Sequence, residues 1–215
     1  MSESRTTSVL VIDDHPLFRK GVADLIGMEP ALSLVGEAAD GEGGVRLAHR
    51  LQPDMILLDL NMKGMDGIET LRRLRAEADL DVRIVMLTVS DNETDVLDAL
   101  RAGADGYLLK DMEPEEILGS LREAVLGHLV ISPHLTELLA RALRDAQGPR
   151  HPDQADLTPR ERQILGLLAK GWSNKLIARE LDVAVGTVKV HVKHILKKLG
   201  LKTRVEAAVW VANAR

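Results

Sequence analysis

Residues 1–126 alternate between short apolar runs and longer amphipathic segments, and this alternation constrains the fold more than any other feature of the chain. The apolar runs are nearly continuous, which is typical of strands in a parallel sheet that helices cover on both faces. The pattern predicts an α/β domain of the (βα)5 type with the flavodoxin-like strand order 2-1-3-4-5. The predicted strands are Ser8–Ile12, Leu32–Ala38, Met55–Leu58, Arg83–Leu87 and Gly106–Leu109. The predicted helices are Leu17–Met28, Gly41–Leu51, Gly67–Glu77, Glu93–Ala102 and Pro114–Leu126.

The stretch after Gly127 follows a different pattern. Leucine and alanine residues recur on one face of a helix, which predicts a linker helix from Pro133 to Ala146. Residues 147–156 contain one Gly and two Pro among polar residues, which is typical of an exposed linker. The sequence therefore predicts three parts, which are an α/β domain at 1–128, a helix with a flexible linker at 129–155, and a small all-α domain at 156–215.

The last part carries the start and stop signals of four helices. Thr158, Pro159 and Glu161 match a capping box, in which the Thr side chain caps the helix and the Glu side chain reaches back. A tight turn at Gly171-Trp172 precedes a short helix that Ser173 can cap. Two helices separated by a tight turn predict a helix-turn-helix domain. The predicted helices are 159–170, 174–181, 185–199 and 204–212.

The net charge of -5 conceals two oppositely charged parts. Residues 1–130 hold 13 Lys and Arg against 25 Asp and Glu, whereas residues 156–215 hold 12 against 5. A compact basic module behind an acidic one indicates a polyanionic partner for the C-terminal part alone.

Several classes of protein and site are excluded by composition. The chain has no cysteine, so disulfides, thiolate zinc sites and cysteine nucleophiles are absent, and any metal site must use oxygen or histidine ligands. Residues 1–8 are polar and the apolar runs are short, so the sequence shows neither a signal peptide nor a membrane span. We therefore expect a cytoplasmic protein.

Polar side chains stand where four of the predicted strands end. Asp13 and Asp14 follow the first strand, Asp59 follows the third, Thr88 ends the fourth, and Lys110 follows the fifth. Because the carboxyl ends of parallel strands meet at one edge of a sheet, we expect these side chains to converge. Crowded carboxylates ionise when a cation joins them, and hard oxygen ligands suit Mg²⁺. Each residue alone is explained as well by a helix cap or a salt bridge, but all of them together favour a site.

Such a site can transfer a phosphoryl group. A carboxylate attacks the phosphoryl donor while Mg²⁺ and Lys110 neutralise the charge on the transferred oxygens, and Asp59 is the candidate nucleophile. One alternative is an enzyme, for example a phosphatase or a nucleotide-binding flavodoxin-like protein. The residues Asp13-Asp14-His15-Pro16 stand where such a protein would carry a Gly-rich phosphate loop, so we expect no enzyme. The other alternative is an interaction module that has lost phosphorylation, which the intact acidic set disfavours.

The predicted helix 185–199 has an apolar face and a basic face. Lys189, Lys193 and Lys197 are spaced four residues apart and form a cationic stripe suited to DNA, although a charge run on a helix is often only a solvated face. We expect Lys189, Val190 and Lys193 to contact base edges and Lys197 and Lys198 to contact phosphates. Ala184 stands at the cap position, and an alanine side chain cannot cap a helix.

Several stretches resemble a known family. Residues 11–15 (VIDDH), 57–62 (LLDLNM), 87–88 (LT) and 108–110 (LLK) look like the signatures of receiver domains, and residues 157–162 (LTPRER) with 187–191 (TVKVH) resemble the LuxR-type helix-turn-helix. Together they are similar to response regulators of the NarL/FixJ class. Residues 103–114 and 204–211 look especially similar to the nitrate/nitrite regulators of that class.

The resemblance implies a two-component response regulator. A sensor histidine kinase would phosphorylate Asp59, and the helix-turn-helix domain would then bind DNA as a homodimer and regulate transcription, with RNA polymerase as a further partner. In the site, Mg²⁺ would be held by Asp13, Asp14, Asp59 and the backbone carbonyl of Asn61. Thr88 and Lys110 would contact the phosphoryl group, and Thr88 and Tyr107 would form the switch. In the helix-turn-helix domain, Val205 and Val209 would make the dimer contact. Lys63 departs from the family, which usually has proline there, and Ala184 replaces the usual Ser or Thr cap.

Overall fold

The computed structural model describes residues 6–77, 80, 82–90, 92–126, 128, 130–131 and 156–213. The chain divides into two compact units, Met1–Val125 and Leu126–Arg215, and each is described by itself. The expected helix Pro133–Ala146 and the linker after it lie outside the described residues.

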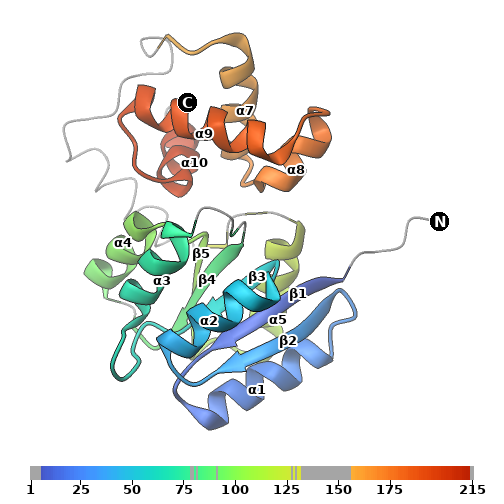
Figure 1. Ribbon diagram of the computed structural model, residues 1–215, viewed down its shortest axis with the longest axis vertical. Coiled ribbons are helices and arrows are strands. Elements are labelled where there is room, and N and C mark those ends of the chain that lie inside the picture. Colours follow the sequence, from blue (N-terminus) through green and yellow to red (C-terminus); the bar gives the residue numbers. More distant parts are fainter. Residues whose placement is uncertain are drawn as a thin grey trace. The chain divides into compact units, whose positions relative to one another are not determined.

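The first unit is a five-stranded parallel sheet with helices on both faces (Figure 1). The strand order is β2-β1-β3-β4-β5, which confirms the predicted topology. The fourth strand is one residue longer than predicted, because Thr88 still pairs with Leu109 of the last strand. The strands are β1 (Thr7–Ile12), β2 (Leu32–Ala38), β3 (Met55–Leu58), β4 (Arg83–Thr88) and β5 (Gly106–Leu109).

Three helices of this unit begin where the sequence supplies a capping side chain. The side chains of Asp40, Asp66 and Asn92 accept hydrogen bonds from the free backbone N–H groups of the first turns of α2, α3 and α4. The first helix begins one residue earlier than predicted, because Pro16 occupies its first turn, where a missing N–H costs nothing. The helices are α1 (Pro16–Gly27), α2 (Gly41–Leu51), α3 (Gly67–Ala76), α4 (Glu93–Ala102) and α5 (Pro114–Leu126).

One glycine sets the position of the segment that follows β3. The backbone N–H of Gly67 donates to the carbonyl oxygen of Leu60 at 2.8 Å. A Cβ atom at Gly67 would lie 2.2 Å from the carbonyl oxygen of Asp59, which is closer than any real contact. Only glycine lets the start of α3 lie against the backbone of Asp59, so this close approach helps to fix the end of β3.

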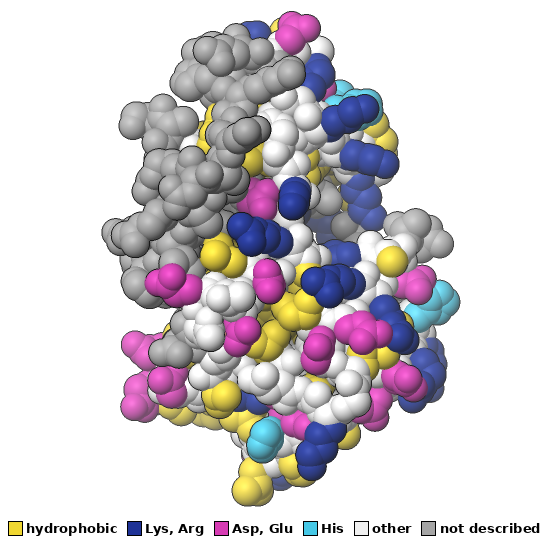
Figure 2. Space-filling model, turned by 90° about the vertical axis from the view of Figure 1, so that its left-hand side faces the viewer, with side chains coloured by type: hydrophobic (Ala, Val, Ile, Leu, Met, Phe, Trp, Pro, Cys, Tyr) yellow, Lys and Arg dark blue, Asp and Glu magenta, His cyan; other side chains and the backbone are white. Residues whose placement is uncertain are grey.

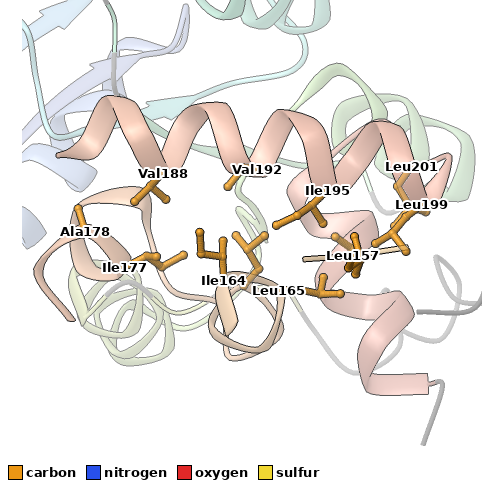
Figure 3. Close-up of a cluster of buried hydrophobic side chains, with 12 residues drawn as sticks. Leu157, Ile164, Leu165, Ile177, Ala178, Val188, Val192, Ile195, Leu199 and Leu201 are labelled. Carbon is orange, nitrogen blue, oxygen red and sulfur yellow. The ribbon is translucent and has the colours of Figure 1, made fainter. Parts of the chain in front are cut away.

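The second unit is built from the predicted helices around one apolar core. The helices are α7 (Pro159–Ala169), α8 (Asn174–Glu180), α9 (Val185–Leu199) and α10 (Arg204–Asn213). Both halves of the capping box at Thr158 and Glu161 are present, and Ser173 caps α8, as predicted. The core brings together buried side chains from all four helices, among them Ile164, Ile177 and Ile195 (Figure 3). Because this core is made within the unit, we expect residues 156–215 to fold alone.

None of the helices in the described part of the chain combines the length and the apolar character that crossing a membrane requires.

The start of α9 lacks a side-chain cap, as the sequence predicts. Ala184 has the extended backbone of a cap residue (φ -66°, ψ 145°), and its side chain makes no cap hydrogen bond to the free N–H groups of the first turn. In Ala184→Ser the new hydroxyl can accept one of these N–H groups, which stabilises a helix by about 1 kcal/mol. We therefore expect the melting temperature of a 150–215 fragment to rise by roughly 4–8 °C.

Ser173→Ala is the matched control, because it removes the cap that Ser173 provides by accepting the N–H of Leu176 at 3.2 Å. Its melting temperature should fall by a similar amount, and both can be followed by circular dichroism. An unchanged melting temperature in Ala184→Ser would show that the start of α9 is satisfied in another way.

Candidate functional site

The parallel register brings the polar strand-end residues together. Ile12 of β1 pairs with Leu58 of β3, so the next residues, Asp13 and Asp59, leave the sheet side by side. The backbone N–H of Asp59 donates to Ile12 at 2.9 Å, and that of Lys110 donates to Thr88 at 2.8 Å. The strand ends that carry these residues therefore lie beside one another at the carboxyl edge of the sheet, as expected from the sequence.

Lys110 holds two carboxylates in this site. Its Nζ atom lies 2.7 Å from Oδ2 of Asp13 and 2.8 Å from Oδ2 of Asp59. The three side chains are only 7%, 3% and 2% exposed, so water screens their charges weakly. One buried cation thus compensates two buried anions, and the cluster keeps an excess of negative charge.

The Asp59 carboxyl is the perturbed acid of this cluster. Burial raises the pKa of Asp59 above its ordinary value, and the nearby Asp13 carboxylate raises it further. The hydrogen bond and the charge of Lys110, together with the N–H of Asn61, lower the pKa but do not restore it. A further cation beside Asp59 would therefore be favourable, because it would stabilise the ionised form.

The side chains present fit a hard cation. Ligand atoms of Asp13, Asp14, His15 and Asp59 all lie within 4.8 Å of one another. Oδ1 of Asp14 is buried and accepts no hydrogen bond from any described residue, although Nδ1 of His15 lies 3.1 Å away. A buried carboxylate oxygen that accepts no hydrogen bond is costly, and a cation would satisfy it. Oxygen ligands of this kind are those that Mg²⁺ prefers.

Asn61 and Lys63 contribute backbone groups to the site. The N–H of Asn61 lies 3.4 Å from Oδ1 of Asp59, and the N–H of Lys63 donates to Oδ2 of Asp14 at 3.1 Å. Proline has no backbone N–H, so the lysine at position 63 permits a bond to Asp14 that the usual proline could not make.

Thr88 and Tyr107 both contact the segment that follows β4. Thr88 is fully buried, and its Oγ1 accepts the N–H of Ser90 at 3.3 Å. The buried Tyr107 hydroxyl donates to the carbonyl oxygen of Ser90 at 2.8 Å. The two residues predicted as a switch thus meet at Ser90, which the sequence analysis did not single out.

Sequence reasoning also missed Phe18. Its ring centroid lies 4.6 Å from Nζ of Lys110. A signal was available, because Phe18 lies in the first turn of α1, directly after the segment that carries Asp13 and Asp14, and such a turn lies over the strand ends.

The second candidate site is the exposed face of α9. Val188, Val192 and Ile195 point into the core, whereas Lys193 and Lys197 are exposed and Val190 is 54% exposed. Lys189 is half-buried and has protein contacts of its own. Figure 2 shows several Lys and Arg side chains together on the helical unit.

Lys198 differs from the other lysines of α9. Its Nζ atom lies 2.7 Å from Oε2 of Glu161 and 3.0 Å from the carbonyl oxygen of Asp156. Burial raises the pKa of Glu161, but the hydrogen bonds from Lys198 and Thr158 outweigh it and hold the pKa below its ordinary value. Glu161 therefore stabilises the fold above its unfolded-state pKa, and this contribution is lost as the pH falls through the folded-state pKa. To reach a phosphate, Lys198 must share or leave these partners.

The expected dimer residues are covered in this structure. Val205 is 0% and Val209 is 2% exposed, so both would have to become exposed before they could contact a second copy.

Known proteins match both units. Residues 9–122 match the response regulator receiver domain family, and residues 155–211 match the luxR family of bacterial regulatory proteins. The nitrate/nitrite response regulator protein NarL of Escherichia coli K12 is 56% identical over 215 residues, covering 100% of this chain and 99% of the relative. The nitrate/nitrite response regulator protein NarP of Escherichia coli K12 is 44% identical over 215 residues, covering 100% of this chain and 99% of NarP.

A solved structure agrees with these matches. The signal receiver domain of the response regulator NarL from Mycobacterium tuberculosis is 36% identical and superposes with a TM-score of 0.55. The superposition covers 58% of this chain and 99% of that domain.

Proposed function

The chain belongs to the response regulators that join a receiver domain to a LuxR-type helix-turn-helix domain, and on this premise we propose that phosphorylation of Asp59 controls its binding to DNA. As members of this family do, the chain regulates transcription by binding DNA. The observation that carries the proposal is the environment of Asp59, a buried carboxyl with a raised pKa that lies 2.8 Å from the ammonium of Lys110.

The proposed reaction is a phosphoryl transfer from a sensor histidine kinase. A carboxylate oxygen of Asp59 attacks the phosphorus of the kinase's phosphohistidine, a P–O bond forms, the P–N bond breaks, and the released imidazole takes up a proton. Lys110 stabilises the charge that develops on the phosphoryl oxygens, and the Thr88 hydroxyl contacts one of them. Asp13, Asp14, Asp59 and the carbonyl of Asn61 would hold Mg²⁺, which would supply further positive charge to these oxygens.

The acyl phosphate signals through the segment after β4. In this structure the Thr88 hydroxyl accepts a hydrogen bond from the N–H of Ser90. The phosphoryl group draws the hydroxyl away from this bond. Because Tyr107 donates to the carbonyl of Ser90, a shift of this segment also changes the place of the Tyr107 side chain.

The DNA contact is made by α9. Lys189, Val190 and Lys193 read base edges, since lysine donates to guanine and valine packs on the thymine methyl group. Lys197 and Lys198 contact phosphates, and Lys198 exchanges its bond to Glu161 for this contact. The uncapped first turn of α9 leaves N–H groups that a phosphate can bind.

Regulation follows from the opposite charges of the two parts. We assign residues 1–128 to the receiver, 129–155 to the linker and 156–215 to the DNA-binding domain. An acidic receiver tethered to a basic domain acts at an effective concentration of roughly millimolar, so that even a weak contact masks the recognition helix. Phosphorylation weakens this contact, and the freed domain dimerises on DNA through Val205 and Val209 once these two buried side chains become exposed.

The proposed signal comes from a named relative. This chain is 56% identical to a nitrate/nitrite response regulator and is proposed to respond to the same signal. RNA polymerase is a further proposed partner. Since its kinase and its DNA lie in the bacterial cytoplasm, the chain works there.

An enzyme and a degenerate receiver are the competing functions. With acetyl phosphate and Mg²⁺, the proposal requires one phosphate per chain that hydroxylamine removes. Rapid release of phosphate over many turnovers would favour an enzyme, and an unlabelled chain would favour a receiver without phosphorylation.

Asp59→Asn removes the proposed nucleophile while it keeps the size of the side chain. We expect labelling by acetyl phosphate to be abolished and the circular dichroism spectrum to stay unchanged. Asp24→Asn, on the exposed side of α1, is the matched control and should be labelled normally. If label persists in Asp59→Asn, another carboxylate is the nucleophile.

The lysines of α9 should separate into two groups. Lys189→Ala and Lys193→Ala remove base contacts, so the ratio of operator to random DNA affinity should fall, with a loss of about 1–3 kcal/mol at the operator. Lys197→Ala removes a phosphate contact and should weaken both affinities about equally. Affinities are measured by fluorescence anisotropy at fixed salt. If all three variants lose affinity equally for operator and random DNA, α9 contacts only the DNA phosphates.

The masking of α9 is tested by removing the receiver. A 150–215 fragment should bind operator DNA without a phosphodonor, and more tightly than the unphosphorylated full chain at equal salt. The phosphorylated full chain is the reference for complete release. If the fragment binds no better than the unphosphorylated chain, release from inhibition is the wrong mechanism. Dimerisation driven by the receiver would then be the better explanation.

A further inference from the structure

Phe18 is the single phenylalanine of the chain, and it lies against the cation of the candidate phosphorylation site. The centroid of its ring is 4.6 Å from Nζ of Lys110, within the range in which an ammonium is attracted to an aromatic face. The Lys110 side chain is 7% exposed, and this attraction grows when the cation is removed from water.

The ring complements the other two contacts of Lys110. An ammonium has three N–H donors, and the carboxylates of Asp13 and Asp59 accept at 2.7 and 2.8 Å. The phenyl ring attracts the charge but has no hydrogen-bond acceptor, so it leaves the donors available to oxygen ligands. A third carboxylate in its place would instead draw the ammonium away from Asp59.

We propose that Phe18 is a positioning residue that holds the Lys110 ammonium beside Asp59 while phosphate is transferred. The inference rests on the proposed function of Asp59. During the transfer Lys110 must exchange the Asp59 carboxylate for a phosphoryl oxygen, and the attraction to the ring does not depend on which oxygen it binds. The cation therefore keeps its place while its partner changes.

The ring is anchored to the same segment as the acidic residues. The N–H of His15 donates to Oδ1 of Asp13 at 2.7 Å, and the Arg19 guanidinium donates to the carbonyl oxygen of Asp13. These bonds lie on either side of Phe18 in the sequence and tie the first turn of α1 to Asp13. The distances from Lys110 to Asp13 and to the ring are thus set by one structural unit.

The test uses fluorination, which withdraws electron density from the ring and weakens its attraction for a cation while it hardly alters the ring's size. Because the chain has one phenylalanine, fluorinated phenylalanine supplied during expression alters position 18 alone. The quantity to measure is the rate constant for phosphorylation by acetyl phosphate in the presence of Mg²⁺. In this reaction Asp59 attacks the phosphorus and acetate leaves. The rate constant should fall stepwise with one, two and three fluorines, by about tenfold over the series.

Two substitutions provide the matched comparison. Phe18→Leu keeps an apolar side chain without an aromatic face and should slow phosphorylation by about three- to tenfold. Phe18→Tyr keeps the face and should stay within about twofold of the unsubstituted chain. Melting temperatures show whether each variant is folded, and the fluorinated chains provide the test even if Phe18→Leu does not fold.

The outcomes separate this inference from the proposed function. Equal rate constants across the fluorinated series would refute the role of Phe18, as would a Phe18→Tyr rate as low as that of Phe18→Leu. If instead the unsubstituted chain takes no phosphate, or Asp59→Asn is still labelled, the assignment of Asp59 fails and the inference fails with it.

Discussion

The site depends on one buried cation. Asp13 and Asp59 lie at the ends of neighbouring strands, and two carboxylates taken out of water repel each other and resist ionisation. Lys110 makes the arrangement stable by contacting both of them, yet it does not neutralise the site, since Asp14 adds a third carboxylate with a buried oxygen that accepts no hydrogen bond from the described residues. The remaining negative charge makes the pocket attractive to a divalent cation, and the raised pKa of Asp59 shows where further positive charge is most useful. The site therefore keeps a net negative charge, and this charge favours the binding of a divalent cation.

The helical unit uses charge in a different way. Its apolar core fixes one face of α9, so that Lys193 and Lys197 are left on the exposed face. Lys198 is held by Glu161, and the same glutamate completes the capping box of α7. Glu161 thus joins the start of one helix to the end of another. Because both partners are partly or fully removed from water, this pair contributes more to the position of α9 than an exposed ion pair would.

Some features of the fold were predictable because they depend on neighbouring residues. The capping box at Thr158, the uncapped start at Ala184 and the alternation of apolar runs are local patterns, and the structure confirms each of them. The remaining differences are at element ends, where a single pairing or cap decides the boundary. Thr88 joins β4 because Leu109 lies beside it, and no pattern within residues 83–88 contains that information.

The sequence by itself determined the alternation of strands and helices, the polar residues at the strand ends and the basic face of α9, because the period of the apolar residues fixes which side of each element is buried. Only the tertiary structure decided the partners of the individual side chains. The ring of Phe18 beside Lys110, the N–H of Lys63 on Asp14, the meeting of Thr88 and Tyr107 at Ser90, and the capture of Lys198 by Glu161 all join residues that are far apart in the chain or lie on different elements. Such contacts depend on distances of a few ångströms between packed elements, and a hydrophobic pattern specifies faces but not those distances.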